Sequence, residues 1–239
     1  DFEELKRLRD ASSTYMNSTT DSGCTVLHFA STGKSTVLLH FFLNEVSQEL
    51  INKPNFIGET PLHWAAQSGT NHIVSLLLRY GAKTNVWDEE GNTPLHFAAR
   101  SEQPKIVRLL VNVQGRSDLV MKNLSGKTPL TIACEEGDHK TIRVLARNCD
   151  KLEDEISYFT RHNHKSIVKT LVACAVKHNS AREGATNPLH TAVKYNKYKI
   201  AKILIQVESW RTGTDAIGRT PADLITSKTD TRLRMLLTP

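Results

Sequence analysis

Residues 60–66 (TPLHWAA) and residues 93–99 (TPLHFAA) are nearly identical, and their starts are 33 positions apart. The motif returns in weaker form at residues 25–30 (TVLHFA), 128–134 (TPLTIAC) and 187–192 (NPLHTA). A related start, TPADL, follows at residues 220–224. A recurring period of this length indicates a repeat protein in which each copy is one supersecondary unit.

The start of each copy has the features of a short helix. Thr60 is a suitable N-cap. Pro61 is tolerated in the first turn because the backbone N–H groups of that turn have no acceptor within the helix, so the N–H that proline lacks is not needed. Leu62 and the two alanines after Trp64 form a narrow apolar face, and Gly69 ends the helix with a permissive backbone.

A second helix follows in each copy. Its apolar residues, Ile73, Val74, Leu77 and Leu78 in the clearest copy, have the i, i+1, i+4, i+5 spacing of a helical stripe. Gly81 stops this helix, and the polar residues around Gly91 supply turn chemistry before the next Thr-Pro. One such pair cannot bury its stripe alone, so the copies are expected to stack.

The Thr-Pro-Leu-His starts, the Ile-Val-x-x-Leu-Leu second helices and the Gly-Ala stops resemble the ankyrin repeat over roughly residues 20–239. The resemblance implies an all-α, right-handed solenoid of about six to seven helix-turn-helix units. We expect one continuous array. Its parts are an N-terminal capping helix and lead-in at 1–19, four repeats at 20–149, a degenerate repeat at 150–181, and a sixth repeat with a C-terminal capping repeat at 182–239.

Two parts of this array are less regular. The capping helix is predicted from Phe2, Leu5 and Leu8, which have basic residues between them. The degenerate repeat lies in the 59-residue gap between Thr128 and Asn187 and has no Thr-Pro start. Either it is a tolerated divergence, or it changes the stacking angle and so shapes a binding surface.

Composition limits the class of protein. The chain has 239 residues, of which 39% are hydrophobic and 23% charged, a balance that is typical of folded, soluble domains. Its apolar runs are far shorter than a membrane span needs, and no signal peptide opens the sequence. Four dispersed cysteines favour a reducing compartment, so we expect an intracellular protein of the cytoplasm or nucleus. Because the sequence begins with Asp1 and not with Met, we expect it to be part of a longer protein, or otherwise a monomer.

No arrangement of residues indicates catalysis, a cofactor or a metal. His28, His63, His96 and His190 share one repeat position, where an imidazole can bridge the backbones of adjacent turns. No Cys or His pair has the spacing of a zinc site. We therefore expect no catalytic, cofactor-binding or metal-binding residues.

Ankyrin proteins bind partners mainly through the turns between units and the exposed ends of the first helices, which line a concave face. Carried to the matching positions, the resemblance implies a set of partner-binding residues: Phe56, Ile57, Trp87, Arg100, Glu135, Arg161, His162, Lys194 and Tyr195. Phe56, Ile57 and Trp87 are large apolar side chains in turns, and they are either binding anchors or packed on the neighbouring turn. Trp64 and Phe97 are expected to be packing residues.

Charge is unevenly distributed. Residues 139–205 contain 13 Lys or Arg and 5 Asp or Glu, a local net charge of +8, which exceeds the +6 of the whole chain. This is either a solvated basic face or a surface for an acidic peptide or protein. Single-stranded nucleic acid, bound by stacking and charge near residues 195–199 (YNKYK), is a minor alternative.

The sequence therefore predicts a non-catalytic protein–protein interaction module, an adaptor or targeting domain that holds a partner protein or peptide on its concave face. A preformed surface of this kind loses little conformational entropy on binding. Two alternatives remain open: the docking part of a larger enzyme or channel, and a pathogen effector that acts on host proteins.

Overall fold

The computed structural model describes residues 18–33, 35–114, 117–149, 152–178 and 187–237, and every regular element in these ranges is a helix. The capping helix predicted at Phe2, Leu5 and Leu8 lies outside the described residues. The chain divides into two compact units, residues 1–136 (unit 1) and 137–239 (unit 2). The repeat boundaries given above remain predictions.

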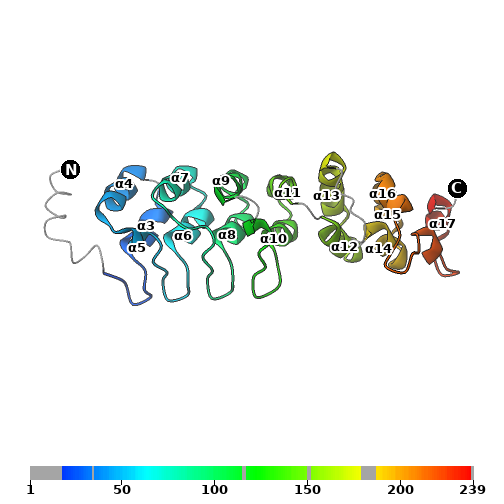
Figure 1. Cartoon of the computed structure of the whole chain (residues 1–239), viewed down its shortest axis with the longest axis horizontal. Helices are drawn as coiled ribbons and strands as arrows, with labels where there is room; N and C mark the ends of the chain where they lie inside the picture. Colours follow the sequence, from blue (N-terminus) through cyan, green and yellow to red (C-terminus); the bar gives the residue numbers. More distant parts are fainter. Residues whose placement is uncertain (1–17, 34, 115–116, 150–151, 179–186, 238–239) are drawn as a thin grey trace. The chain divides into compact units, whose positions relative to one another are not determined.

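Unit 1 is built from helix pairs in two layers. Its described helices are α3 (Val26–Thr32), α4 (Thr36–Glu45), α5 (Gln48–Ile51), α6 (Pro61–Ser68), α7 (Asn71–Arg79), α8 (Pro94–Arg100), α9 (Pro104–Gln114), the 3-10 helix η1 (Ser117–Val120) and α10 (Pro129–Glu136). One layer holds α4, α7 and α9, and the other, the inner layer, holds α3, α6, α8 and α10 (Figure 1). Long loops project beyond the inner layer.

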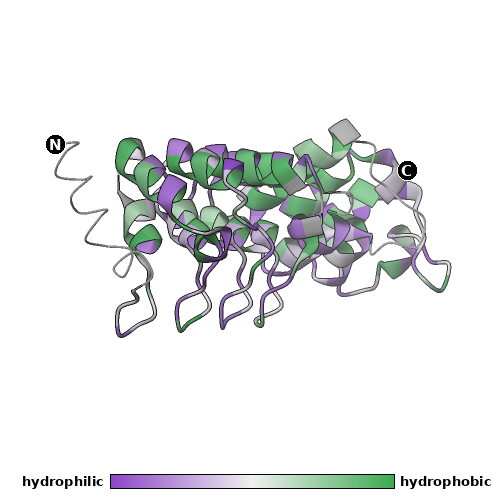
Figure 2. Ribbon diagram, turned by 60° about the vertical axis from the view of Figure 1, so that its left-hand side comes forward, coloured by the Kyte–Doolittle hydropathy of each residue, from purple (hydrophilic) through white to green (hydrophobic). Residues whose placement is uncertain are grey.

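The interface between these helices is apolar and buried, as the apolar pattern predicts. Leu62, Ala65 and Ala66 on α6 are fully buried, and so are Ile73 and Leu77 on α7. The small side chains on α6 let neighbouring inner helices approach closely. Gly69 ends α6 with a left-handed backbone at φ +79°, as expected of a helix C-cap. In Figure 2 the helices of unit 1 are mostly hydrophobic and the projecting loops mostly hydrophilic.

Unit 2 continues the same kind of pairing. Its described helices are α11 (His139–Ala146), α12 (Glu153–Arg161), α13 (Lys165–His178), α14 (Pro188–Lys194), α15 (Tyr198–Leu204), α16 (Glu208–Thr212), the 3-10 helix η2 (Ala222–Leu224) and α17 (Thr231–Leu237). Helix α12 packs on α13 and α14, and α15 packs on α13, α14 and α17.

The degenerate repeat forms a complete helix pair, α12 and α13, without a Thr-Pro start. Its first helix begins with Glu153, Asp154 and Glu155, whose carboxylates are favourable at the positive end of a helix. The carboxylate of Glu153 also accepts a hydrogen bond from the backbone N–H of Leu152 (3.0 Å). The acidic run that replaces the missing motif is thus itself a helix start.

The last repeat differs from the others in its inner helix. The segment after Thr220-Pro221 makes only the three-residue η2, whereas α6 and α10 each have eight residues. Residues 225–230 then form a turn in which the backbone N–H of Asp230 donates to Asn196 Oδ1 (2.9 Å). Helix α14 is therefore only partly covered on the side of the last repeat.

Across the described ranges, none of the helices combines the length and the apolar character that crossing a bilayer requires.

Candidate functional site

The long loops of unit 1 end in three similar turns, here called fingers: residues 55–59, 88–92 and 123–127. Each begins with an Asn or Asp whose side-chain oxygen accepts two backbone N–H groups of its own turn. Asn55 accepts from Ile57 and Glu59, at 3.2 and 2.9 Å. Asp88 and Asn123 repeat the pattern. These Asx turns fix the shape of each finger without any packed core.

Hydrogen bonds also join neighbouring fingers. The backbone N–H of Glu89 donates to the carbonyl of Ile57 (2.9 Å), and that of Leu124 donates to the carbonyl of Glu90 (2.9 Å). The approach is so close that a Cβ on Gly58 would lie 2.8 Å from Asp88 Cα. The fingers of unit 1 therefore form a connected row whose side chains project from a stiff backbone.

Three predicted anchors lie on or directly beside this row and are here called the finger anchors: Phe56 and Ile57 in the first finger, and Trp87, which directly precedes the second. Their side chains are 71%, 50% and 60% exposed. The ring of Phe56 lies against the backbone of Gly23, so it packs partly on the neighbouring turn, as the alternative interpretation proposed. An aromatic side chain held in water on a rigid loop has little entropy left to lose on binding.

Trp64 and Phe97 have the packing role that the sequence predicted. Phe97 is buried, and its ring lies edge-on to His63 at a centroid distance of 5.2 Å. Trp64 is half-buried, lies edge-on to Phe29, and donates its indole N–H to the carboxylate of Glu59 (2.6 Å). Trp64 thus joins the base of the first finger to the inner helices, and Phe97 packs between the inner helices α6 and α8.

The repeated histidines are structural, as predicted. Nε2 of His28, His63 and His96 lies 2.9–3.1 Å from the carbonyl oxygens of Glu59, Asn92 and Lys127 respectively, each in the next finger. Their Nδ1 atoms accept the backbone N–H of the threonine that caps the same helix. His190 keeps the forward bond, to Arg219 O at 2.7 Å, but its buried Nδ1 has no hydrogen-bond partner, and the capping residue of this helix is Asn187 in place of a threonine.

Burial determines how these imidazoles titrate. Desolvation lowers the pKa of His63 to about 4, and it also lowers the pKa values of His28 and His96. The bonds to carbonyl oxygens oppose this shift only in part. These side chains are neutral near pH 7, and their hydrogen bonds stabilise the fold. In the described part of the chain, no three His, Cys, Asp or Glu side chains gather as a metal site would need.

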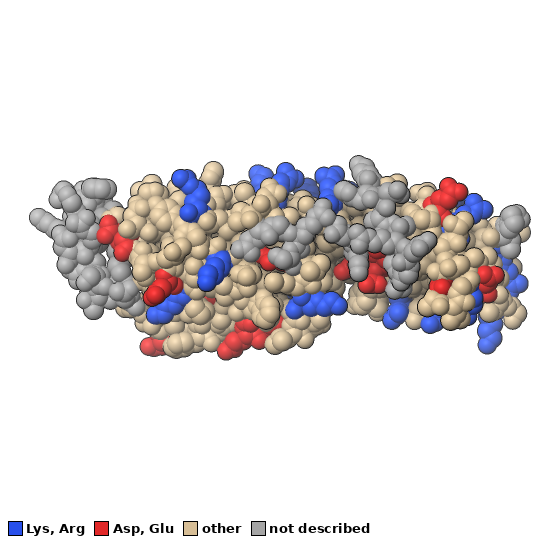
Figure 3. Space-filling view, viewed as in Figure 1, with Lys and Arg blue, Asp and Glu red and all other residues tan. Residues whose placement is uncertain are grey.

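Two other predicted residues of unit 1 lie at the ends of inner helices. Arg100, the last residue of α8, is exposed, and its guanidinium lies 6.0 Å from the ring centroid of Phe97. Glu135 on α10 forms an ion pair with Lys127 of the third finger (2.8 Å). Along the lower edge of unit 1, Figure 3 shows acidic side chains with a few basic ones among them.

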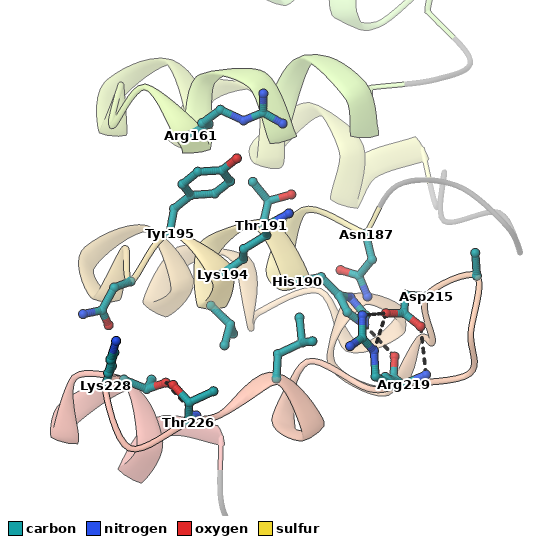
Figure 4. A pocket seen from close by; sticks show the side chains of 15 residues that line it. Arg161, Asn187, His190, Thr191, Lys194, Tyr195, Asp215, Arg219, Thr226 and Lys228 are labelled. Carbon is teal, nitrogen blue, oxygen red and sulfur yellow. Dashed lines mark hydrogen bonds and ion pairs between the residues drawn. The ribbon is translucent and has the colours of Figure 1, made fainter.

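Unit 2 brings three predicted residues together at a pocket of about 930 Å³. Arg161 at the end of α12 lies over the ring of Tyr195, 5.2 Å from its centroid, and the Lys194 ammonium lies 5.9 Å from the same centroid. Figure 4 shows Arg161 on α12 facing Tyr195, with Lys228 and Thr226 across the pocket. His162, the fourth predicted residue of unit 2, lies outside the pocket lining and packs on Tyr158.

Several pocket residues did not stand out in the sequence. Arg219 and Asp215 belong to a fourth Asx turn, at residues 215–219, and form an ion pair of 2.9 Å. Hydrogen bonds from the backbone and side chain of Arg219 lower the pKa of Asp215. Counting from Gly218 would have found both residues, whereas nothing in the sequence marks Lys228. Leu124, in the third finger, is 81% exposed and is a further apolar side chain that is not among the predicted anchors.

Comparison with known proteins agrees with this architecture. The family model for ankyrin repeats, which describes three copies, matches residues 2–87, 27–123 and 73–155. A probable protein S-acyltransferase 23 of Arabidopsis thaliana is 32% identical over 126 residues, 53% of this chain and 23% of that protein. The ADP-ribosylation factor GTPase-activating protein AGD2 of the same plant is 36% identical over 69 residues, 29% of this chain and 9% of that protein.

The chain thus spans less than a quarter of the length of either of these relatives. The family match, by contrast, covers well over half of the chain, and the capped helix pairs, the left-handed glycines and the histidine bridges agree with it. This chain belongs to the ankyrin-repeat family.

Proposed function

We propose that this chain is a non-catalytic recognition module that binds a partner protein through the finger anchors of unit 1. The observation that carries the proposal is the exposure of Phe56, Ile57 and Trp87 on, or directly beside, fingers that are hydrogen-bonded to one another. Large apolar side chains fixed in water are typical binding hot spots. Ankyrin repeats are generally protein–protein interaction modules, which supports the same function.

The chemistry of the described residues favours binding over catalysis. The most deeply buried titratable side chains are the bridging histidines His28, His63 and His96. Their ring nitrogens are hydrogen-bonded to backbone groups, as in His63. Cys24, Cys134 and Cys174 are buried thiols, which fits the reducing interior of a cell. We therefore propose an adaptor or targeting role in the cytoplasm or nucleus.

A second candidate function is the docking part of a longer protein. It is favoured by the two relatives, in each of which the similar segment makes up only a small part of the chain. In that case the finger anchors would hold a substrate or regulator near a catalytic part elsewhere in the same protein. Both candidates assign the same surface to binding, so the same variants test it.

The test is affinity capture from a cell lysate with the intact chain and with the double variant Phe56→Ser, Trp87→Ser. A control, Val113→Ser, removes an exposed apolar side chain from α9, in the layer of α4, α7 and α9 that does not carry the fingers. We expect proteins captured by the intact chain and by the control to be lost from the double variant, with all three melting at similar temperatures. Equal capture by the double variant would show that the fingers are not the binding surface.

A further inference from the structure

We infer that the pocket of unit 2 binds an acidic peptide segment. The inference rests on the proposed recognition function and names the chemical class of one partner. Three properties of the pocket support it: the shortened helix beside it, the positive charges that line it, and the cations that cover its aromatic rings.

The pocket lies where the inner helix of the last repeat is shortened to η2. In unit 1 the inner helix α6 is covered by α8, and α8 by α10. On the side of α14 that faces the last repeat, the inner helix is the three-residue η2, and it is followed by a turn in which Asn196 accepts a hydrogen bond from Asp230. Thr191, Lys194 and Tyr195 therefore line an open space of about 930 Å³. This volume is in the upper part of the range typical of ligand sites.

The charge around this space is positive and largely unneutralised. Arg161, Lys194 and Lys228 are exposed, and no carboxylate among the described residues forms an ion pair with any of them. Asp215 is the acidic residue of the described lining, and Arg219 neutralises it. Three cations thus face the pocket from α12, α14 and the turn after η2 (Figure 4). An anionic partner would be attracted before contact and held after it.

The placement of these cations favours a chain of carboxylates over one compact anion. A single phosphate is usually held by several donors that converge on one point. Here the donors come from three separate elements around an open pocket, one of them across the space from the other two. Several carboxylates spaced along a peptide would meet them one at a time.

The aromatic rings argue against single-stranded nucleic acid, which needs free ring faces for base stacking. The ring of Tyr195 is already covered by Arg161 at 5.2 Å, with Lys194 at 5.9 Å. The ring of the nearby Tyr198 is covered by the guanidinium of Arg232 at 5.0 Å. Cation–π contacts of this kind occupy the rings and hold the guanidinium groups in place.

The experiment measures binding of a short fluorescein-labelled oligoglutamate peptide to the full chain by fluorescence anisotropy, with oligoglutamine as the uncharged match. The pocket variant is Arg161→Gln, Lys194→Gln, Lys228→Gln. The control is Lys165→Gln, Lys169→Gln, Lys202→Gln, which removes the same charge from exposed positions on α13 and α15. We expect the pocket variant to weaken oligoglutamate binding about tenfold and the control less than about twofold.

Three results would overturn the inference. One is binding of oligoglutamate no tighter than that of oligoglutamine. Another is equal weakening by both triple variants, which would mean diffuse attraction. The third is displacement of the peptide by oligothymidylate or by inorganic phosphate at matched charge, which would assign the pocket to phosphates. A pair variant, Lys194→Gln with Lys228→Gln, leaves Arg161 on Tyr195 and keeps the test valid if the triple variant is poorly folded.

Failure here is distinguishable from failure of the proposed function. If the natural chain fails to bind oligoglutamate more tightly than oligoglutamine while protein capture still depends on Phe56 and Trp87, only the acidic-peptide site is refuted. Retained oligoglutamate binding with capture unaffected by the finger variant refutes the finger surface and leaves the pocket assignment in place.

Discussion

Nε2 of His63 lies 3.1 Å from the carbonyl oxygen of Asn92, a residue 29 positions later in the sequence. Nδ1 of the same ring accepts the backbone N–H of Thr60 at 3.0 Å, which places the ring proton on Nε2. One neutral imidazole therefore caps its own helix and ties that helix to the next finger. The same bridge recurs at His28 and His96.

Acid should destabilise the protein through these bridges. The folded-state pKa of His63, about 4, is below the ordinary value of 6.5, so the unfolded chain takes up a proton that the folded chain refuses. The contribution of the neutral His63 to the free energy of unfolding is fully present above pH 6.5 and is lost as the pH falls toward 4. For His63 the loss is about 3 kcal/mol. Urea unfolding at several pH values in this range measures it.

A His63→Gln variant separates this effect from the titration of carboxylates. It should be less stable than the natural chain at neutral pH but lose less stability between pH 6.5 and 4. Parallel pH profiles for the two proteins would contradict the assignment of the proton linkage to His63.

Gly58 and Gly126 occupy equivalent finger positions, with φ values of +82° and +73°. A Cβ at Gly58 would meet the backbone of Asp88, whereas a Cβ at Gly126 would meet nothing within 4 Å. We expect Gly126→Ala to cost about 1 kcal/mol from backbone strain alone, and Gly58→Ala to cost about 3 kcal/mol because the clash is added. Thermal or urea unfolding compares them, and equal losses would mean that the fingers do not press together.

Trp64 and Trp87 should respond differently to truncation. Trp64→Ala removes ring contacts with His28 and Phe29 and the hydrogen bond to Glu59, so we expect a loss of about 2 kcal/mol. Trp87→Ala should change the free energy of unfolding by less than about 0.5 kcal/mol because its side chain is exposed. If Trp87→Ala lowers the melting temperature as far as Trp64→Ala, Trp87 is a packing residue and not an anchor.

Glu102 has a left-handed backbone, with φ +54°, at the turn after α8. Strain destabilises a residue with a Cβ in this conformation by about 1 kcal/mol. Glycine has no such strain, but its greater conformational entropy in the unfolded chain destabilises the folded state by somewhat less than this amount. We expect Glu102→Gly to stabilise the protein by about 0.5 kcal/mol. Asn163 has φ +64° in the equivalent turn, and Asn163→Gly should be nearly neutral because Asn tolerates this conformation. A destabilised Glu102→Gly would show that its side chain supports the turn.

The sequence by itself determined the helix pairs and the bridging role of the histidines. These depend on residues a few positions apart, such as Thr60 with His63, and on a period that the repeats make visible. It also predicted that Phe56, Ile57 and Trp87 lie in turns, which the structure leaves exposed. Local hydrogen bonding and apolar periodicity are enough for such inferences.

Only the tertiary structure decided how distant residues combine. It placed Arg161 on Tyr195, 34 positions away, and brought Lys228 to the same pocket. It also reduced the last inner helix to three residues after a Thr-Pro start that resembles the others. The reason is that a pocket forms where no neighbouring helix covers a surface. Whether a neighbour covers it depends on how distant segments pack together, and not on the local conformational preference of any one segment.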